Sequence, residues 1–156
     1  MGKYLFFDID GTLLSDVTHT VPQSAIEAIK KAKENGHHCF FCTGRSYFMT
    51  KEISFTGIED AIIANGAAVV RDGKPESQKI ISGDVVKKTL ELIEELGGGY
   101  QIIDWKNGYQ NSYTHAMFEE QFKKKFDEPV EEVFKKKSMK TMDEIENNPI
   151  LKIDAT

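Results

Sequence analysis

The first run of apolar residues covers Tyr4 to Phe7, where four apolar side chains follow one another without polar alternation. Such a run is typical of a strand buried on both faces of a parallel sheet. It ends at Asp8, and Asp10-Gly11 then breaks the pattern. Because side chains alternate along a strand, Asp8 and Asp10 are expected to share one side of a central strand's carboxyl end, with Ile9 pointing away. Open α/β sheets bind ligands at that end.

The pattern up to residue 81 alternates between expected strands and helices. Pro22 opens a helix to about Glu34, and Asn35-Gly36 closes it. The remaining elements expected here are a strand at 37–42, a short helical segment at 48–55, a strand at 61–64 and a hairpin of 67–70 with 78–81. Strand, helix and strand at this spacing form a parallel βαβ unit, so residues 1–81 are predicted to be an α/β part.

Beyond Gly83 the pattern changes to helices around a hairpin. Apolar positions predict a helix at about 85–96, and Asn107-Gly108 predicts a hairpin of 100–105 with 109–113. A helix carrying Phe118, Phe122 and Phe126, a short helix at 142–147 and a strand at 151–154 are expected to follow. The lysine runs 123–125 and 135–137 stand beside acidic residues and are interpreted as solvated helix faces. Residues 82–156 are therefore predicted to be a separate α+β part.

Composition narrows the class of protein. The 156 residues are 40% hydrophobic and carry a net charge of −5, which gives no electrostatic reason to expect nucleic acid or an anionic membrane as a partner. No apolar run approaches the length of a membrane span, and no signal peptide is recognised, so a cytoplasmic protein is expected. Cys39 and Cys42 lie three apart on an expected strand and should point to opposite faces, so both are interpreted as buried, unpaired residues.

Three motifs resemble one known family. Asp8 to Leu14, Asp-Ile-Asp-Gly-Thr-Leu-Leu, resembles motif one of the haloacid-dehalogenase-like (HAD) phosphatases, and Thr43-Gly44-Arg45 resembles their motif two. Ala64 to Ala67, Ala-Asn-Gly-Ala, resembles the Cof-type, sugar-phosphatase-like branch. Local alternatives remain open: Thr43 or Ser46 could cap the next helix with Arg45 solvated, and Asn65 could be only a turn residue.

The resemblance implies a Mg²⁺-dependent phosphatase that acts on small phosphorylated metabolites such as sugar phosphates. Asp8 would be the nucleophile that forms an aspartyl-phosphate, and Asp10 would be the acid and then the base. Mg²⁺ would be held by Asp8 and by the main-chain carbonyl of Asp10. The residues expected to bind phosphate are Gly11, Thr43, Gly44 and Arg45. Thr12 would brace the motif-one loop, and Asn65 would lie at the rim of the cleft.

The same resemblance implies a Rossmann-like core, holding strands one to three of its parallel sheet, with an α+β cap beginning after strand three. The family's later motifs, a phosphate-binding lysine and an acidic pair, are not found; Lys152 lies in an apolar strand pattern and lacks the expected glycine turn. We therefore expect a truncated enzyme that is inactive alone, and expect self-association or completion by a C-terminal segment. The alternative is a non-catalytic remnant that binds or scaffolds. A phospho-receiver domain is set aside, because strand three ends in Ala64-Asn65-Gly66 and carries no acceptor aspartate.

Overall fold

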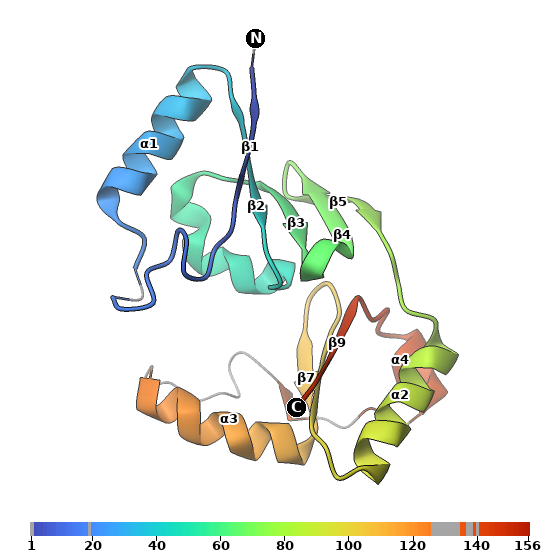
Figure 1. Ribbon diagram of the computed structural model, residues 1–156. Helices are drawn as coiled ribbons and strands as arrows, with labels where there is room; N and C mark the ends of the chain where they lie inside the picture. Colours follow the sequence, from blue (N-terminus) through green and yellow to red (C-terminus); the bar gives the residue numbers. More distant parts are fainter. Residues whose placement is uncertain (1, 19, 126–134, 137–138, 140) are drawn as a thin grey trace. The chain divides into compact units, whose positions relative to one another are not determined.

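The computed structural model describes residues 2–18, 20–125, 135–136, 139 and 141–156 (Figure 1). The chain divides into two compact units, residues 1–79 and 80–156. Within the described ranges, no helix combines the length and apolar character needed to cross a membrane.

The first unit is built on a five-stranded sheet in the order β1-β2-β3-β4-β5. Its strands are β1 (Tyr4–Phe7), β2 (His38–Cys42), β3 (Asp60–Ile63), β4 (Ala68–Arg71) and β5 (Lys74–Gln78). The first three strands are parallel, and β4 and β5 are antiparallel to their neighbours. The helices are α1 (Gln23–Glu34) and the 3-10 helices η1 (Tyr47–Thr56) and η2 (Ala64–Gly66). This mixed sheet with parallel leading strands confirms the predicted α/β fold class.

Local signals account for the connections of this unit. Pro22 is the N-cap of α1, and Asn35 followed by Gly36 at φ +78° ends that helix, as predicted. Asp72 and Gly73, both at positive φ, form a two-residue turn, so β5 begins at Lys74. The prediction that the second strand of this hairpin covers 78–81 was wrong. After a two-residue turn, the next residue already pairs with the first strand, here Lys74 with Arg71. Pro75 is tolerated in β5 because β5 is an edge strand.

The two faces of the first sheet differ. Residues pointing to one face are largely buried, among them Phe41, Ala61, Ile63 and Val70. On the opposite face, Tyr4 and Phe6 of β1 remain 59% and 54% exposed. Among the described strands β1 lies at one edge of the sheet. The prediction that this strand is buried on both faces was wrong there, because only one face of β1 is covered.

The second unit has a four-stranded sheet in the order β8-β7-β6-β9. Its strands are β6 (Tyr100–Ile103), β7 (Gly108–Gln110), β8 (Lys135–Lys136) and β9 (Lys152–Ala155). Its helices are α2 (Gly83–Glu95), α3 (Ser112–Lys125) and α4 (Met142–Glu146). The helix α4 starts with a capping box, in which Thr141 and Glu144 satisfy each other's backbone donors.

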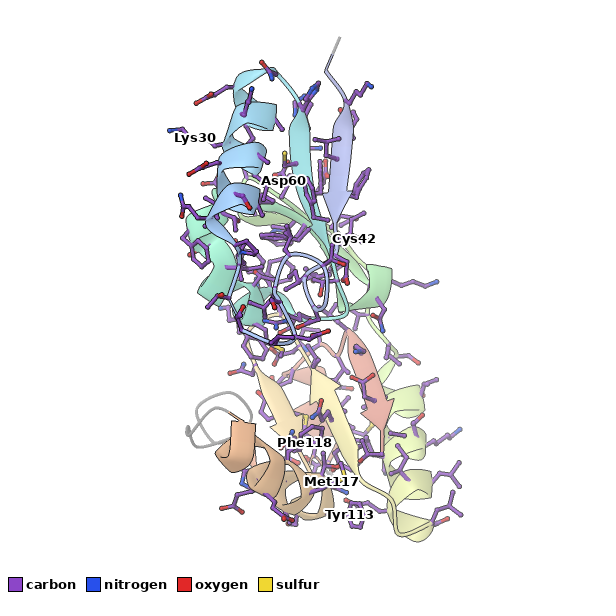
Figure 2. The ribbon with its side chains drawn as sticks, turned by 60° about the vertical axis from the view of Figure 1, so that its left-hand side comes forward. Lys30, Cys42, Asp60, Tyr113, Met117 and Phe118 are labelled. Atoms are coloured by element: carbon purple, nitrogen blue, oxygen red, sulfur yellow. The ribbon has the colours of Figure 1, made fainter. Side chains whose placement is uncertain are left out.

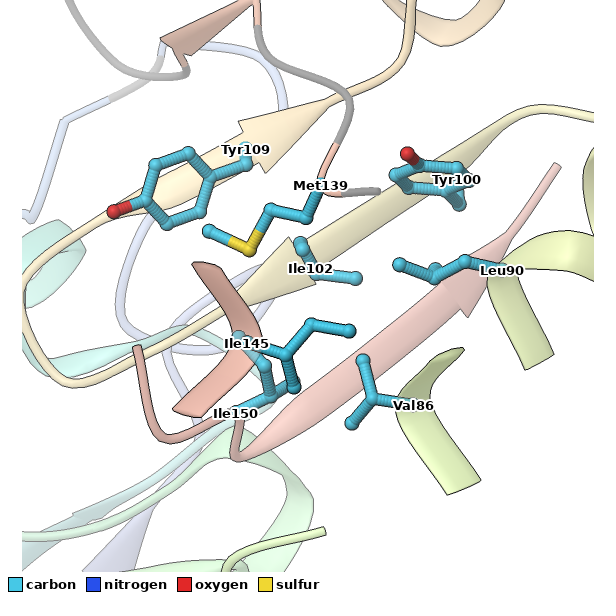
Figure 3. Packing of buried hydrophobic residues seen from close by; sticks show 8 residues of the cluster. All are labelled: Val86, Leu90, Tyr100, Ile102, Tyr109, Met139, Ile145 and Ile150. Atoms are coloured by element: carbon cyan, nitrogen blue, oxygen red, sulfur yellow. The ribbon is translucent and has the colours of Figure 1, made fainter. Parts of the chain in front are cut away.

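A cluster of buried hydrophobic side chains forms the core of the second unit (Figure 3). Its buried members are Val86, Leu90, Tyr100, Ile102, Tyr109, Met139, Ile145 and Ile150. They come from α2, α4, the strands β6 and β7 and the segments beside them, so helices cover one face of this sheet. Burying large apolar side chains in this way stabilises a domain by about 1.5–3 kcal/mol for each one.

Two predictions for this unit were wrong. The second hairpin strand was expected to reach Tyr113, but it ends at Gln110 because the Asn111 side chain accepts a hydrogen bond from the Thr114 N–H (3.1 Å) and so caps α3. Lys135 and Lys136 form β8, which pairs in parallel with β7, instead of lying on a helix. Phe126 and Lys137 lie outside the described residues.

The cysteines are not bonded to each other. Cys39 is buried and Cys42 is exposed near the end of β2 (Figure 2), so they point to opposite faces as predicted. The prediction that both are buried was wrong for Cys42, which points to the uncovered face of the sheet. Burial raises the pKa of the Cys39 thiol, and the nearby Lys33 partly offsets this effect.

Candidate active site

The segment after β1 folds back on itself in a tight loop. The Leu14 N–H donates to the Ile9 carbonyl (2.8 Å), the Leu13 N–H to the Asp8 carbonyl (3.3 Å) and the Gly11 N–H to the Leu14 carbonyl (3.0 Å). Gly11 has φ +73°, and a Cβ there would lie 3.1 Å from a carboxylate oxygen of Asp16. Glycine suits this position because of its left-handed backbone, and a Cβ would require only a small shift of the Asp16 carboxylate.

Ile9 is fully buried, whereas Asp8 and Asp10 on either side of it are exposed. This is the alternation predicted from the sequence, with Ile9 turned into the core. The Thr12 hydroxyl lies 3.5 Å from Asp8 Oδ2, at the long limit of a hydrogen bond. Thr12 thus contacts the first carboxylate from within the same loop.

Arg45 holds Asp10 in a two-pronged ion pair. Its Nε donates to Oδ2 at 2.9 Å and its Nη2 donates to Oδ1 at 2.6 Å. The Arg45 Nη1 donates to the Met49 carbonyl in η1 at 3.3 Å, so the guanidinium is fixed from two sides. Only 16% of the Arg45 side chain is exposed, against 57% for Asp10. Bidentate pairs of this kind fix geometry as well as adding energy.

Thr43 lies buried at the carboxyl end of β2, and its hydroxyl oxygen accepts a hydrogen bond from the Arg45 N–H (3.1 Å). Its carbonyl accepts from the Asn65 N–H (3.2 Å), while the Arg45 carbonyl accepts from the Ala64 N–H (2.8 Å). The loops after β2 and β3 are therefore joined by backbone hydrogen bonds, and Arg45 links both to the loop after β1.

Ala64 and Asn65 adopt left-handed backbone conformations, with φ of +49° and +56°. Asparagine tolerates this region, but alanine there costs roughly 1–2 kcal/mol. Strain of this kind gathers at functional sites, where the surrounding structure holds it in place. The third loop thus carries local strain at the point where it meets Thr43 and Arg45.

Comparison with known proteins decides the family. A family model described as haloacid dehalogenase-like hydrolase matches residues 5–156. The chain belongs to this family. Its predicted membership, including the Cof-type branch, is confirmed.

Individual relatives agree. The chain is 32% identical over 95 residues to "Putative phosphatase YkrA" of Bacillus subtilis (strain 168), an alignment that covers 60% of this chain and 37% of that protein. It superposes on BT1666 from Bacteroides thetaiotaomicron, a HAD-superfamily phosphatase, with a TM-score of 0.76 and 29% identity over 96% of this chain and 54% of the other. It superposes on the HAD subclass IIB sugar phosphatase BT4131 with a TM-score of 0.70 and 27% identity. That match covers 95% of this chain and 56% of the other. The chain thus spans about half the length of these solved structures.

The structure brings several of the predicted site residues of this HAD-family chain together. Asp10, Thr43 and Arg45 are joined directly, and Thr12 reaches Asp8. Two of the groups that were predicted to bind phosphate are bonded to other partners in the structure. The Arg45 guanidinium engages Asp10, and the Gly11 N–H donates within its own loop. The predicted phosphate-binding roles of Gly11, Thr43, Gly44 and Arg45 therefore stay predictions.

The carboxylates of the loop after β1 could supply some, but not all, of the ligands of a Mg²⁺ ion. Among the residues that the structure describes, no group of three or more histidine, cysteine, aspartate or glutamate side chains is arranged to hold a metal ion. Exposed carboxylate oxygens on one loop nevertheless suit Mg²⁺, which is held in many sites by one or two carboxylates with water completing the octahedron. The exposed carboxylate of Asp8 fits such a ligand better than that of Asp10, because Arg45 occupies both carboxylate oxygens of Asp10.

Two contributors were missed from the sequence. The Met49 carbonyl supports Arg45, and Asp16 lies against Gly11. A main-chain carbonyl carries no signature in the sequence. Asp16 stands in a polar loop like many others, so no pattern distinguished it.

Proposed function

We propose that this chain carries the nucleophile, the acid-base group and the first phosphate-binding loops of a phosphatase that acts on small phosphorylated metabolites such as sugar phosphates. The Asp10–Arg45–Thr43 connection carries the proposal, because it joins the carboxylate of motif one to the hydroxyl of motif two. Membership of the HAD-like hydrolases, and relatives named as phosphatases, support it.

In the proposed reaction, a carboxylate oxygen of Asp8 forms a bond to phosphorus while the bond from phosphorus to the ester oxygen breaks. The leaving oxygen takes a proton from the Asp10 carboxyl group. Water then attacks the phosphorus, Asp10 takes its proton, and the Asp8–phosphorus bond breaks to release inorganic phosphate. Mg²⁺, when bound, would offset the repulsion between the carboxylate and the phosphate dianion.

The contacts of Asp10 set a condition on this sequence. Both of its carboxylate oxygens accept hydrogen bonds from Arg45, so Asp10 has to turn from the guanidinium before it can give a proton to the leaving oxygen. The released guanidinium would then be available to a phosphate, which fits the predicted role of Arg45. Residues 82–156 are proposed to belong to a cap that selects the substrate. A cytoplasmic location is part of the same proposal.

A direct test uses beryllofluoride, which mimics a phosphoryl group on a carboxylate and needs no turnover. Fluorine NMR of the full chain with Mg²⁺ should show a bound species, and Asp8→Asn should abolish it. Asp72→Asn is the matched control, because Asp72 is an exposed carboxylate in the β4–β5 turn, whose positive φ asparagine also tolerates. A bound signal that survives Asp8→Asn would overturn the assignment of Asp8. No bound signal in the unmodified chain would favour the non-catalytic alternative.

A further inference from the structure

Asparagine is followed by glycine at three places in the chain: Asn35-Gly36, Asn65-Gly66 and Asn107-Gly108. In this dipeptide the glycine nitrogen can attack the side-chain amide carbon of the asparagine, because glycine has no side chain to shield its nitrogen. A folded chain controls this reaction through the hydrogen bonds of the groups that must meet. The three dipeptides differ in these bonds, so they should react at different rates.

We propose that Asn65 is a site of spontaneous deamidation in the folded chain and reacts faster than the asparagines of the other two dipeptides. The Gly66 nitrogen forms a bond to Cγ of Asn65, the bond from Cγ to the amide nitrogen breaks, and the proton of the Gly66 N–H leaves with the ammonia. Water then opens the succinimide ring at either carbonyl. The product is aspartate or isoaspartate, so a carboxylate replaces the neutral amide.

The peptide group between Asn65 and Gly66 has no hydrogen bond to hold it. Within the described part of the chain, neither the Gly66 N–H, the Asn65 carbonyl nor the Asn65 side chain takes part in one. Both residues are exposed, and nothing lies within 4 Å of the position that a Cβ of Gly66 would take. The glycine nitrogen can therefore turn toward the side chain without breaking a hydrogen bond of its own.

The neighbouring bonds do not oppose this rotation. The Asn65 N–H donates to the Thr43 carbonyl (3.2 Å), and the Ala67 N–H donates to the Ala64 carbonyl (3.2 Å). Cyclisation needs a change in ψ of Asn65, which is 35°, and a matching change in φ of Gly66, which is +91°. Glycine populates positive and negative φ alike, so this one peptide group can turn while both bonds stay in place.

The other two dipeptides are held by hydrogen bonds. The Gly36 N–H donates to the Lys33 carbonyl (2.9 Å) at the end of α1, so the attacking nitrogen has to leave that bond first. At Asn107 the side-chain amide itself is held, because its Nδ2 donates to the two carboxylate oxygens of Asp104 at 3.3 and 3.4 Å. The Asn107 carbonyl also accepts from the Asp104 N–H (3.0 Å). Deamidation at either place therefore costs at least one bond.

A carboxylate at position 65 would change the candidate site. The loop that carries Asn65 is bonded to the carbonyls of Thr43 and Arg45, two residues that are predicted to bind phosphate. A negative charge in this loop opposes the binding of a phosphate, and isoaspartate also lengthens the main chain by one carbon atom. The site should therefore weaken as the protein ages. This consequence rests on the proposed function, whereas the modification itself does not.

The test is peptide mapping of the full chain after incubation at mildly alkaline pH. Cleavage after lysine and arginine places the three asparagines in separate peptides, 34–45, 52–71 and 107–123. Mass spectrometry detects each deamidation, because a hydroxyl group replaces an amino group. In the folded chain, 52–71 should convert first, 34–45 more slowly and the Asn107 position of 107–123 last. In denaturant the three should convert at similar rates, because each asparagine then has only its glycine neighbour to set the rate.

Two variants test the consequence for the site. Asn65→Asp reproduces one product, and aspartate tolerates the same positive φ. It should weaken beryllofluoride binding roughly two- to five-fold, the range of one interaction between exposed charges. Asn35→Asp is the matched control and should leave this binding unchanged, because Asn35 lies at the end of α1.

The outcomes separate the modification from the function. A folded chain in which 34–45 or the Asn107 position converts before 52–71, or in which all three convert alike, would overturn the proposed modification. Undiminished beryllofluoride binding by Asn65→Asp would overturn its consequence for the site. A missing beryllofluoride signal in the unmodified chain would count against the proposed function, and the peptide map would still decide the modification.

Discussion

The two sheets differ in how far they bury the tyrosine that begins a strand in each. Tyr4 begins β1 in the first unit and is 59% exposed, whereas Tyr100 begins β6 in the second and is fully buried. Around Tyr100, the helix α2 contributes Val86 and Leu90, and α4 contributes Ile145. On the Tyr4 face of the first sheet, the structure records ring contacts to His38 and Phe40 within the sheet itself.

This difference teaches what an apolar run can and cannot predict. The run from Tyr4 to Phe7 has the composition of a strand buried on both faces, and it does form a strand. Burial, however, depends on what packs against each face, and that information lies elsewhere in the chain. Tyr100 points to the face of its sheet that α2 and α4 cover, whereas Tyr4 points to the uncovered face of the first sheet.

The largest expected effect compares a core residue of the second unit with an edge residue of the first. Ile102→Ala should lower the free energy of unfolding of the second unit by about 2–5 kcal/mol, because Ile102 is fully buried and the substitution leaves a cavity. Tyr4→Ala should lower that of the first unit by less than about 1 kcal/mol, because Tyr4 is 59% exposed. Denaturant unfolding followed by circular dichroism measures both. Equal losses would show that the two sheets are covered alike.

A second comparison uses two glycines with nearly the same backbone angle. Gly11 (φ +73°) lies in the motif-one loop, and Gly97 (φ +71°) follows α2 with open space around it. Substitution by alanine should cost roughly 1–2 kcal/mol of stability at either position, since both force a side chain into the left-handed region. Only Gly11→Ala should also weaken beryllofluoride binding, because it disturbs the loop between Asp8 and Asp10. Equal binding by both variants would contradict the proposed role of that loop.

The smallest expected effect concerns pH and the second unit alone. Burial, with a contribution from the nearby Asp104, raises the pKa of Tyr109 to about 12 from its ordinary value of 10.0. Because the folded state favours the neutral phenol, this contribution to stability is complete below pH 10 and is lost as the pH rises through about 12. Unfolding measured across that window should show the loss in the unmodified chain. Tyr109→Phe should remove that part of the slope, and an unchanged slope would exclude Tyr109 as its source.

Much of the fold follows from local signals. Pro22 and Asn35-Gly36 delimit α1 through their own backbone preferences, so their neighbours suffice to predict them. The predicted hairpin of β6 and β7 is present, but Gly108 pairs with Ile103 instead of forming the turn. The loop covers 104–107, where Asp104 Oδ1 accepts hydrogen bonds from the Lys106 and Asn107 N–H groups. Lys135 and Lys136 show the limit, because their pairing with β7 depends on a strand far away in the sequence.

The candidate site also has one feature that the sequence predicts and one that it does not. The meeting of the loops after β1 and β2 follows from the rule that parallel strands end at the same edge. The partner of Arg45 could not be predicted, because a guanidinium can serve a phosphate or a carboxylate equally well. In the folded chain the guanidinium engages Asp10 and also donates to the Met49 carbonyl of η1, and neither contact has a local signal in the sequence.

The central claim is that the Asp8 carboxylate forms the centre of the site, and Mg²⁺ titration by calorimetry tests it most directly. We expect weak binding to the full chain, because no cluster of three acidic or other metal-binding side chains exists among the described residues and Mg²⁺ sheds its water reluctantly. Asp8→Asn should remove the heat of binding, and Asp72→Asn should leave it unchanged. Tight Mg²⁺ binding that survives Asp8→Asn would contradict the account.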